Sequence, residues 1–151
     1  MKLSTKGRHA ITAMMELALR DNKGPVTLAD ISVEQSISVS YLEQLFARLR
    51  NHGLVTGMRG PGGGYCLRRP ASEVTIAEIL SAVDDAMPAR RERIPGEEWP
   101  QSVILWNRLS SRIYDYLDGL TLAEAVAQDN QEKEEEQSGD RFDSGFQQSA
   151  A

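Results

Sequence analysis

Between Ser38 and Tyr65, a helix-forming pattern runs directly into an unusually glycine-rich segment. Four apolar side chains recur at the spacing of one helix face: Leu42, Leu45, Phe46 and Leu49. Gly53 stands where a left-handed helix cap is expected, and Leu54–Thr56 and Tyr65–Arg68 are typical of two short strands. The segment therefore predicts a helix with one buried face, followed by a two-stranded hairpin.

The residues before this helix add a second helix and a tight turn. An amphipathic pattern over residues 1–20 predicts a first helix, which Gly24 and Pro25 end. Thr27 and Asp30 have the spacing of a capping box for the next helix, and residues 36–38 form the turn. A helix, a turn, a polar-faced helix and a hairpin give a winged helix-turn-helix. The expected fold class is mainly α with a small β-wing.

Three motifs together resemble a known family. They are Leu3–Arg8, Ser40–Leu45 and Arg59–Tyr65. Their combination closely resembles the IscR-type iron-sulfur cluster regulators, within the wider Rrf-type group of dimeric bacterial transcription regulators. The resemblance extends from about Met1 to Val126. It implies genes of iron-sulfur cluster assembly, or of related sulfur and iron metabolism, as targets.

The charge of the chain is unevenly distributed. The 151 residues carry a net charge of -5, which is unfavourable for binding phosphate backbones. Residues 1–70, however, hold ten Lys and Arg against five Asp and Glu, whereas residues 71–151 hold seven against seventeen. The half with the helix-turn-helix is therefore net +5, and the other half is net -10.

The expected recognition helix carries most of the candidate DNA-binding residues. They are Ser38, Ser40, Tyr41, Glu43, Gln44, Arg48 and Arg50. Serine can donate or accept, Gln44 can pair with adenine, and Glu43 accepts only from a base amine such as that of cytosine. Glu43 can therefore also contribute to sequence specificity, because its negative charge disfavours bases that offer only acceptors. Ser40 and Glu43 lie three residues apart, which also fits a capping box, and both roles can hold at once.

Further candidates lie outside this helix. Lys6 and Arg8, near the start of the first helix, are either ordinary solvated charges or contacts to DNA phosphates, and the resemblance favours the second alternative. Arg59 is expected in a minor groove, where a guanidinium responds to groove width. Gly60, Gly62 and Gly63 would let the wing backbone pass close to DNA. A nucleotide-binding P-loop is not expected, because the glycines lack the Gly-Lys-Ser/Thr ending.

The segment 84–100 departs from the resembled family. In IscR-type regulators the corresponding loop carries three cysteines, and a histidine follows on the next helix, together ligating a [2Fe-2S] cluster. This segment contains neither residue type, and Val103 falls near the histidine position. No cofactor and no metal is therefore expected. An unusual site remains as an alternative, built from His9, His52, Glu16, Glu92, Glu97 and Glu98, or from Cys66 of two chains.

A long helix is expected from Gln101 to Leu117, with apolar residues in steps of three and four. The residues assigned to dimerisation are Val103, Trp106, Leu109, Ile113, Tyr116 and Leu117. A short helix opened by Thr121 should follow. The acidic stretch after Gln128 is expected to be disordered, and it either solubilises the chain, repels nonspecific DNA or contacts a partner.

The sequence thus predicts four regions: a winged helix-turn-helix over 1–83, the cysteine-free loop over 84–100, a dimerisation helix and a short helix over 101–128, and an acidic tail over 129–151. The expected function is a homodimeric repressor without a cluster that binds an imperfect palindrome in double-stranded DNA. Alternatives are control by a partner protein, as in cluster-free relatives, or a protein-interaction module that keeps the fold. Without a catalytic constellation, a signal peptide or a long apolar run, we expect a cytoplasmic protein that is neither an enzyme nor membrane-bound.

Overall fold

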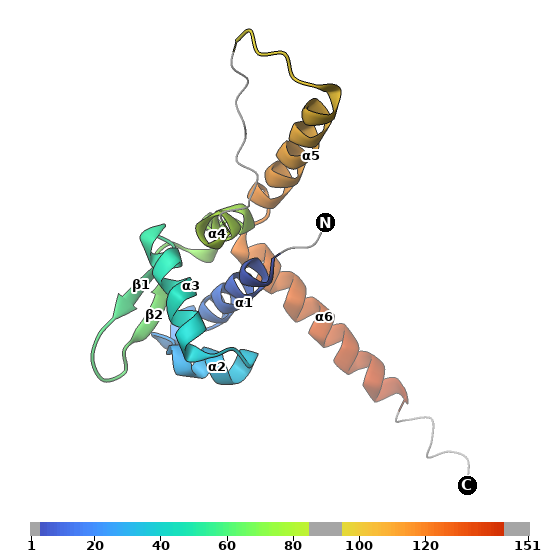
Figure 1. Cartoon of the computed structure of the whole chain (residues 1–151). Helices are drawn as coiled ribbons and strands as arrows, with labels where there is room; N and C mark the ends of the chain where they lie inside the picture. The colour runs from blue at the N-terminus through green and yellow to red at the C-terminus, as the bar shows by residue number, and fades with distance from the viewer. Residues whose placement is uncertain (1–3, 85–94, 144–151) are drawn as a thin grey trace.

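A computed structural model of the chain describes residues 4–84 and 95–143, with side chains described up to residue 137. Most of it is helical, with one antiparallel pair of strands that projects as a wing (Figure 1). The elements are α1 (Thr5–Leu19), η1 (Asp21–Lys23), α2 (Leu28–Gln35), α3 (Val39–Asn51), β1 (Val55–Met58), β2 (Gly64–Leu67), η2 (Ala71–Glu73), α4 (Ile76–Val83), α5 (Gln101–Asp118) and α6 (Leu122–Asp143). The expected fold class, mainly α with a small wing, is confirmed.

Local side-chain caps set where the helices begin. The hydroxyls of Ser4, Thr27 and Ser38 accept from backbone amides at the starts of α1, α2 and α3. Thr75 and Glu78 form a reciprocal capping box on α4. Ser36 has a φ of 53°, so the chain turns sharply from α2 into α3.

The core lies between α1, α3 and α4. All four residues of the predicted apolar stripe on α3 are buried, and Phe46 and Leu42 have no exposed surface. From α1, Met14 and Leu17 pack into the same cluster, as do Ile79 and Leu80 from α4. Burial of this stripe leaves the opposite face of α3 in solvent.

The wing is anchored to the body by Tyr65. Its amide donates to the Val26 carbonyl at 2.8 Å, and its carbonyl accepts from the Val26 amide at 2.9 Å. Its ring packs on Phe46 of α3, with 4.8 Å between the ring centroids. In the strand pair Thr56 lies opposite Cys66 and Gly57 opposite Tyr65. Tyr65 therefore helps to fix the position of the wing relative to α3, because it contacts both the segment before α2 and α3 itself.

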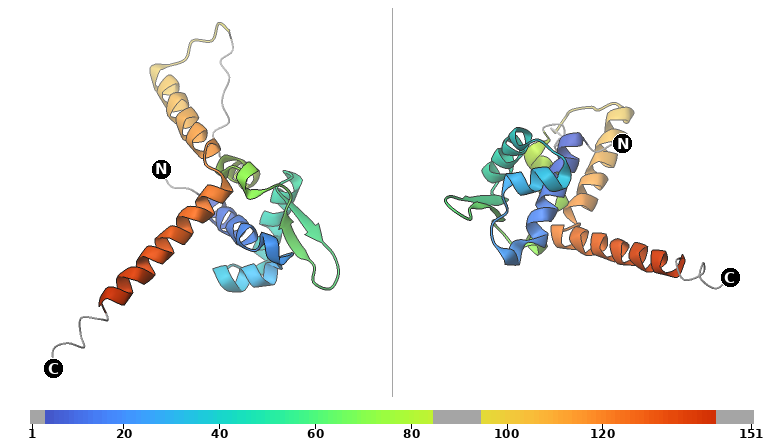
Figure 2. Two further views of the ribbon diagram at one scale, coloured as in Figure 1. Left: turned by 180° about the vertical axis from the view of Figure 1, so that it is seen from behind. Right: turned by 90° about the horizontal axis from the view of Figure 1, so that it is seen from below.

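The helices α5 and α6 leave the body in different directions (Figures 1 and 2). Their junction is fixed to α4, because the Ile76 amide donates to the Leu120 carbonyl at 2.9 Å and the Leu122 amide donates to the Val74 carbonyl at 2.8 Å. Among the residues that the structure describes, no helix has both the length and the apolar character to cross a bilayer.

The last helix differs from the sequence-based prediction. A short helix and then disorder from residue 129 were expected, whereas α6 continues to Asp143. The physical reason is composition: glutamate, glutamine and lysine are good helix formers, and Lys133 pairs with Asp129 one turn away. The remainder of the expected tail, residues 144–151, and most of the cysteine-free loop, residues 85–94, lie outside the described residues.

Candidate nucleic-acid interface

The N-terminal half of α3 presents polar side chains to solvent. Ser38, Ser40, Glu43 and Gln44 are all exposed. Ser38 caps the helix by accepting from the Tyr41 amide at 3.3 Å. The alternative of a capping box made by Ser40 and Glu43 is therefore wrong, because the extended residue before the helix is Ser38, with a ψ of 142°. Ser40 and Glu43 remain available to a ligand.

The N-terminal region of α1 lies beside the start of α3. His9 contacts Tyr41 edge to face, with 5.5 Å between ring centroids and an interplanar angle of 84°. Lys6 and Arg8, on the same end of α1, are exposed. This contact brings two cations close to the polar half of α3.

The wing carries Arg59 at its tip, where the side chain is exposed. Gly60 and Gly62 have φ values of 96° and 73°, which residues with a Cβ rarely adopt. A Cβ on Gly63 would lie 2.4 Å from the Met58 carbonyl oxygen, and the Gly63 amide donates to the Gly60 carbonyl at 2.9 Å. The glycines are therefore needed to close the turn that presents Arg59.

The two arginines near the end of α3 occupy different environments. Arg50 is exposed, whereas Arg48 is half-buried and donates from Nη1 to the Val83 carbonyl at 3.2 Å. The two positions looked alike in the sequence. Only the fold separates a solvent-facing cation from one engaged with α4.

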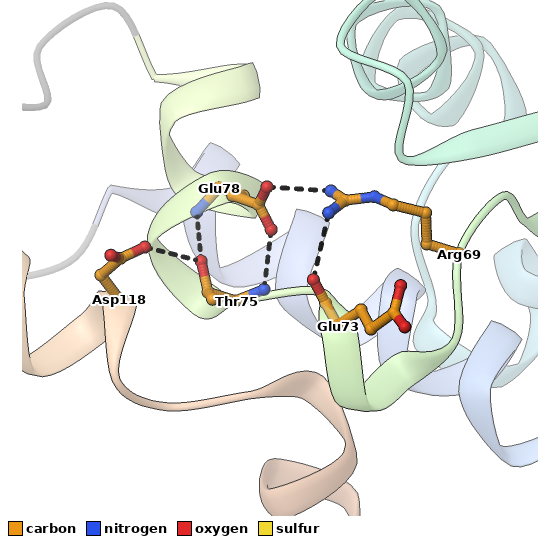
Figure 3. Close-up of polar contacts among 5 residues, drawn as sticks. All are labelled: Arg69, Glu73, Thr75, Glu78 and Asp118. Carbon is orange, nitrogen blue, oxygen red and sulfur yellow. Dashed lines mark hydrogen bonds and ion pairs between the residues drawn. The ribbon is translucent and has the colours of Figure 1, made fainter.

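A polar network that sequence analysis missed supports the base of the wing (Figure 3). Arg69, just after β2, donates to the Glu78 carboxylate at 2.9 Å and to the Glu73 carbonyl at 3.1 Å. Thr75 donates from its hydroxyl to Asp118 at 3.2 Å, which joins α4 to the end of α5. The capping box of Thr75 and Glu78 was visible in the sequence, but its partners on other elements were not.

Glu78 is the charged centre of this network. Partial burial raises the pKa of its carboxyl group, but the Thr75 amide and the Arg69 guanidinium lower the pKa more in sum. The net result is a pKa below the ordinary value of 4.5. Glu78 is therefore held as a carboxylate that keeps Arg69 in place.

The possible metal ligands are dispersed. Cys66 is on β2, with its Sγ 3.8 Å from the Met58 thioether sulfur. His9 is on α1, and His52 ends α3 with its Nδ1 3.0 Å from the Arg48 carbonyl oxygen. Within residues 4–84 and 95–143, no three His, Cys, Asp or Glu side chains gather as a metal site. The donors available there do not fit a [2Fe-2S] cluster, which needs thiolate or imidazole ligands.

The residues assigned to dimerisation divide into two groups. Trp106, Leu109 and Tyr116 are exposed, with 65% of Trp106 and 72% of Tyr116 accessible. Leu117 packs against the core, and Val103 and Ile113 are half-buried. Leu105, which was outside the assigned set, is 53% exposed and extends the apolar face. A single chain therefore leaves one face of α5 uncovered.

Comparison with known proteins agrees with this arrangement. The Rrf2 family model, described as an iron-dependent transcriptional regulator, matches residues 3–128. The transcriptional regulator IscR of Erwinia tasmaniensis is 49% identical over 136 residues, which cover 87% of this chain and 81% of the relative. IscR of Photorhabdus laumondii is 50% identical, over 87% of this chain and 82% of its own.

Two solved structures are similar over most of their length. The structure of CymR, named the global cysteine regulator of B. subtilis, has a TM-score of 0.73 and 35% identity, covering 85% of this chain and 98% of its own. The structure of T. potens IscR has a TM-score of 0.72 and 34% identity, covering 85% of this chain and 88% of its own. Both similarities therefore extend over most of this chain.

Proposed function

Because this chain belongs to the Rrf2 family of transcription regulators, we propose that it acts as an IscR-like repressor that binds DNA as a homodimer and holds no iron-sulfur cluster. Family membership makes the chain a DNA-binding transcription regulator rather than an enzyme. The observation that carries the proposal is the pairing of two exposed features, the polar half of α3 and the wing with Arg59.

In the proposed complex α3 enters the major groove and the wing lies over the adjacent minor groove. Ser40, Glu43 and Gln44 would face base edges, since all three are exposed near the N-terminus of α3. Arg59 would respond to the narrow, more negative minor groove of particular sequences. Lys6, Arg8 and Arg50 would contact phosphates and make affinity depend on salt.

The homodimer is proposed from the uncovered face of α5. Exposed apolar side chains at Leu105, Trp106, Leu109 and Tyr116 are costly in water and gain free energy when a second copy covers them. A two-fold axis at α5 would place two copies of α3 about 34 Å, or a multiple, apart. The two-fold symmetry of such a dimer would be matched by an imperfect palindrome in the operator.

The absence of a cluster is proposed from the donor set. The chain has one cysteine, and the segment 84–100 has none, whereas the resembled family uses three cysteines and a histidine. Genes of iron-sulfur cluster assembly, or of related sulfur and iron metabolism, are the proposed targets, since the matched relatives at about half identity are IscR regulators. Without a cluster, the regulator would need another source for its signal. Control of its DNA binding by a partner protein is the second candidate mechanism.

The test combines spectroscopy with DNA binding. The full chain is purified without oxygen, its absorption spectrum, iron and acid-labile sulfide are measured, and binding to a duplex enriched from a randomised pool is titrated at two salt concentrations. A colourless, iron-free protein that binds this duplex more tightly than random DNA supports the proposal. Visible absorption bands with stoichiometric iron and sulfide would refute the cluster-free state.

The wing gives a separate test against a protein-interaction module. Arg59→Ala is expected to weaken binding to the enriched duplex by about tenfold or more, because a minor-groove cation is lost. The matched control is Arg108→Ala, since Arg108 is an exposed arginine on α5 and not on the wing. Equal affinities for the two variants would favour an interaction module over a DNA reader.

A further inference from the structure

We propose that Arg48 is a positioning residue, which orients the recognition helix by tying it to the end of α4, and that it does not contact DNA. This inference rests on the proposed DNA-reading role of α3. It assigns to Arg48 a function that differs from that of Arg50, although both arginines lie in the last turns of the same helix.

The guanidinium of Arg48 has a structural acceptor. Its Nη1 donates to the Val83 carbonyl oxygen at 3.2 Å, and this carbonyl belongs to the last turn of α4. Carbonyls in the last turn of a helix lack partners within the helix, and they carry the negative end of the helix dipole. A cation that donates there is well placed, and Val83 itself has no exposed surface. A guanidinium in this position is turned toward the protein.

The position of Arg48 around α3 explains what the contact does. Tyr41 and Arg48 are seven residues apart, so they lie on the same edge of the helix, separated by about 10 Å along its axis. Both are half-buried, Tyr41 against His9 of α1 and Arg48 against Val83 of α4. Two anchors on one edge prevent α3 from rolling about its axis. Rolling would turn Ser40 and Glu43 away from the base edges that they are proposed to read.

Arg50 provides a matched comparison within the same helix. Two residues further along, it lies about 160° around the axis from Arg48, on the opposite edge. Its side chain is exposed. It has the same charge and the same length, but it lacks the contact with α4. Substitution of each arginine therefore separates the loss of a charge from the loss of an anchor.

The experiment measures affinity as a function of salt for the full chain and for three variants, Arg48→Gln, Arg48→Met and Arg50→Met. Two probes are used: the duplex enriched by the unaltered chain from a randomised pool, and the random pool itself. A lost phosphate contact lowers the slope of log K against log salt by about 0.9. A lost anchor leaves the slope unchanged, but it weakens the base contacts that only the enriched duplex offers.

The expected results differ for each variant. Arg48→Met should bind the enriched duplex about tenfold more weakly and the random pool less than about twofold more weakly. Its slope of log K against log salt should be unchanged. Arg48→Gln, which keeps an amide donor without the charge, should keep the slope and most of the specificity. Arg50→Met should lose affinity for both probes alike, with the lower slope.

Three outcomes would overturn the inference. The first is a slope reduced by about 0.9 in Arg48→Gln, and the second is an Arg48→Met variant that is folded and binds both probes as the unaltered chain does. Circular dichroism and thermal unfolding establish folding, and if Arg48→Met does not fold, the Arg48→Gln variant decides. The third is an equal loss of affinity for the two probes in Arg48→Gln. If the unaltered chain binds neither probe, the failure belongs to the proposed function and not to Arg48.

Discussion

Gly64 lies where β2 passes closest to the segment before α2. Its φ is 156°, and a Cβ built there would lie 2.4 Å from the Val26 carbonyl oxygen and 2.6 Å from the carbonyl carbon. Both neighbours are backbone atoms, so neither can rotate away. The two hydrogen bonds between Val26 and Tyr65 thus depend on a glycine at this position.

Gly64→Ala is expected to destabilise the fold by about 1–3 kcal/mol, because the strand must move away from Val26 and backbone strain is added. Urea denaturation measures this change in the free energy of unfolding. The control is Gly57→Ala, where the nearest atom to an added Cβ is a Tyr65 ring carbon at 3.6 Å, an ordinary contact. Equal stabilities of the two variants would show that the approach of Val26 does not constrain the wing.

The contribution of Glu78 to the stability of the fold is expected to depend on pH. A carboxyl group whose pKa is lower in the folded than in the unfolded chain stabilises the fold above the unfolded pKa, and this contribution is lost as the pH falls through the folded pKa. The pKa of Glu78 is lowered from 4.5, through the Thr75 amide and Arg69 against an opposing effect of burial. Its contribution should therefore be complete near neutral pH and decline below about pH 4.5.

The measurement compares the unaltered chain with Glu78→Gln by urea denaturation from pH 7 downward. The difference in unfolding free energy should reach at most about 1 kcal/mol, since the side chains of Glu78 and Arg69 are each 36% exposed. It should shrink in acid. Glu73→Gln removes the same charge without breaking these contacts and serves as control. A difference that grows on acidification would contradict the assignment.

At the scale of elements, α5 is an amphipathic helix with an apolar face that the chain itself does not cover. Leu109→Asp places a charge in the middle of that face, between Trp106 and Tyr116. If a second copy covers the face, burial of this charge costs several kcal/mol and the dimer dissociates. Sedimentation equilibrium should then show a monomer that remains folded.

Arg108→Glu is the matched control for this change. Arg108 is exposed and lies about 100° around the helix from Leu109, on a polar part of the surface. This variant should stay dimeric at the protein concentration where Leu109→Asp is monomeric. A Leu109→Asp variant that stays dimeric would exclude this face of α5 as the interface.

At the scale of the whole molecule, basic and acidic residues are separated. Residues 129–151 hold two basic and seven acidic residues, so their removal takes away a net charge of -5. In the part of α6 whose side chains the structure describes, residues 122–137, the residues that join the hydrophobic core are Leu122 and Ala125. The free energy of unfolding of a chain ending at Gln128 should therefore differ from that of the full chain by less than about 1 kcal/mol.

The same truncation should strengthen binding to the random DNA pool at low salt, because acidic charge near a phosphate backbone opposes association. Titration at low salt and at about 0.15 M, where the screening length is about 8 Å, measures the effect. The difference between the two chains should narrow at the higher salt. Equal affinities at low salt would mean that the acidic part of α6 does not influence DNA binding.

The sequence by itself determined the elements whose causes are local. The apolar stripe of α3, the cap at Gly53, the Thr75 capping box and the glycine-rich wing were all predictable, because each depends on residues within a few positions of one another. The local prediction failed at α6, where an acidic composition indicated disorder although its residues are good helix formers.

Only the tertiary structure decided which of two chemically similar side chains is exposed to solvent and which is held by contacts within the fold. Arg48 and Arg50 have the same charge and both lie near the end of α3, and the sequence does not show that α4 engages Arg48 and leaves Arg50 in solvent. Tyr65 became the anchor of the wing, and Arg69 the partner of Glu78, through contacts between elements. The physical reason is that burial and hydrogen bonding depend on which surfaces meet after the helices pack, and a linear pattern does not contain that information.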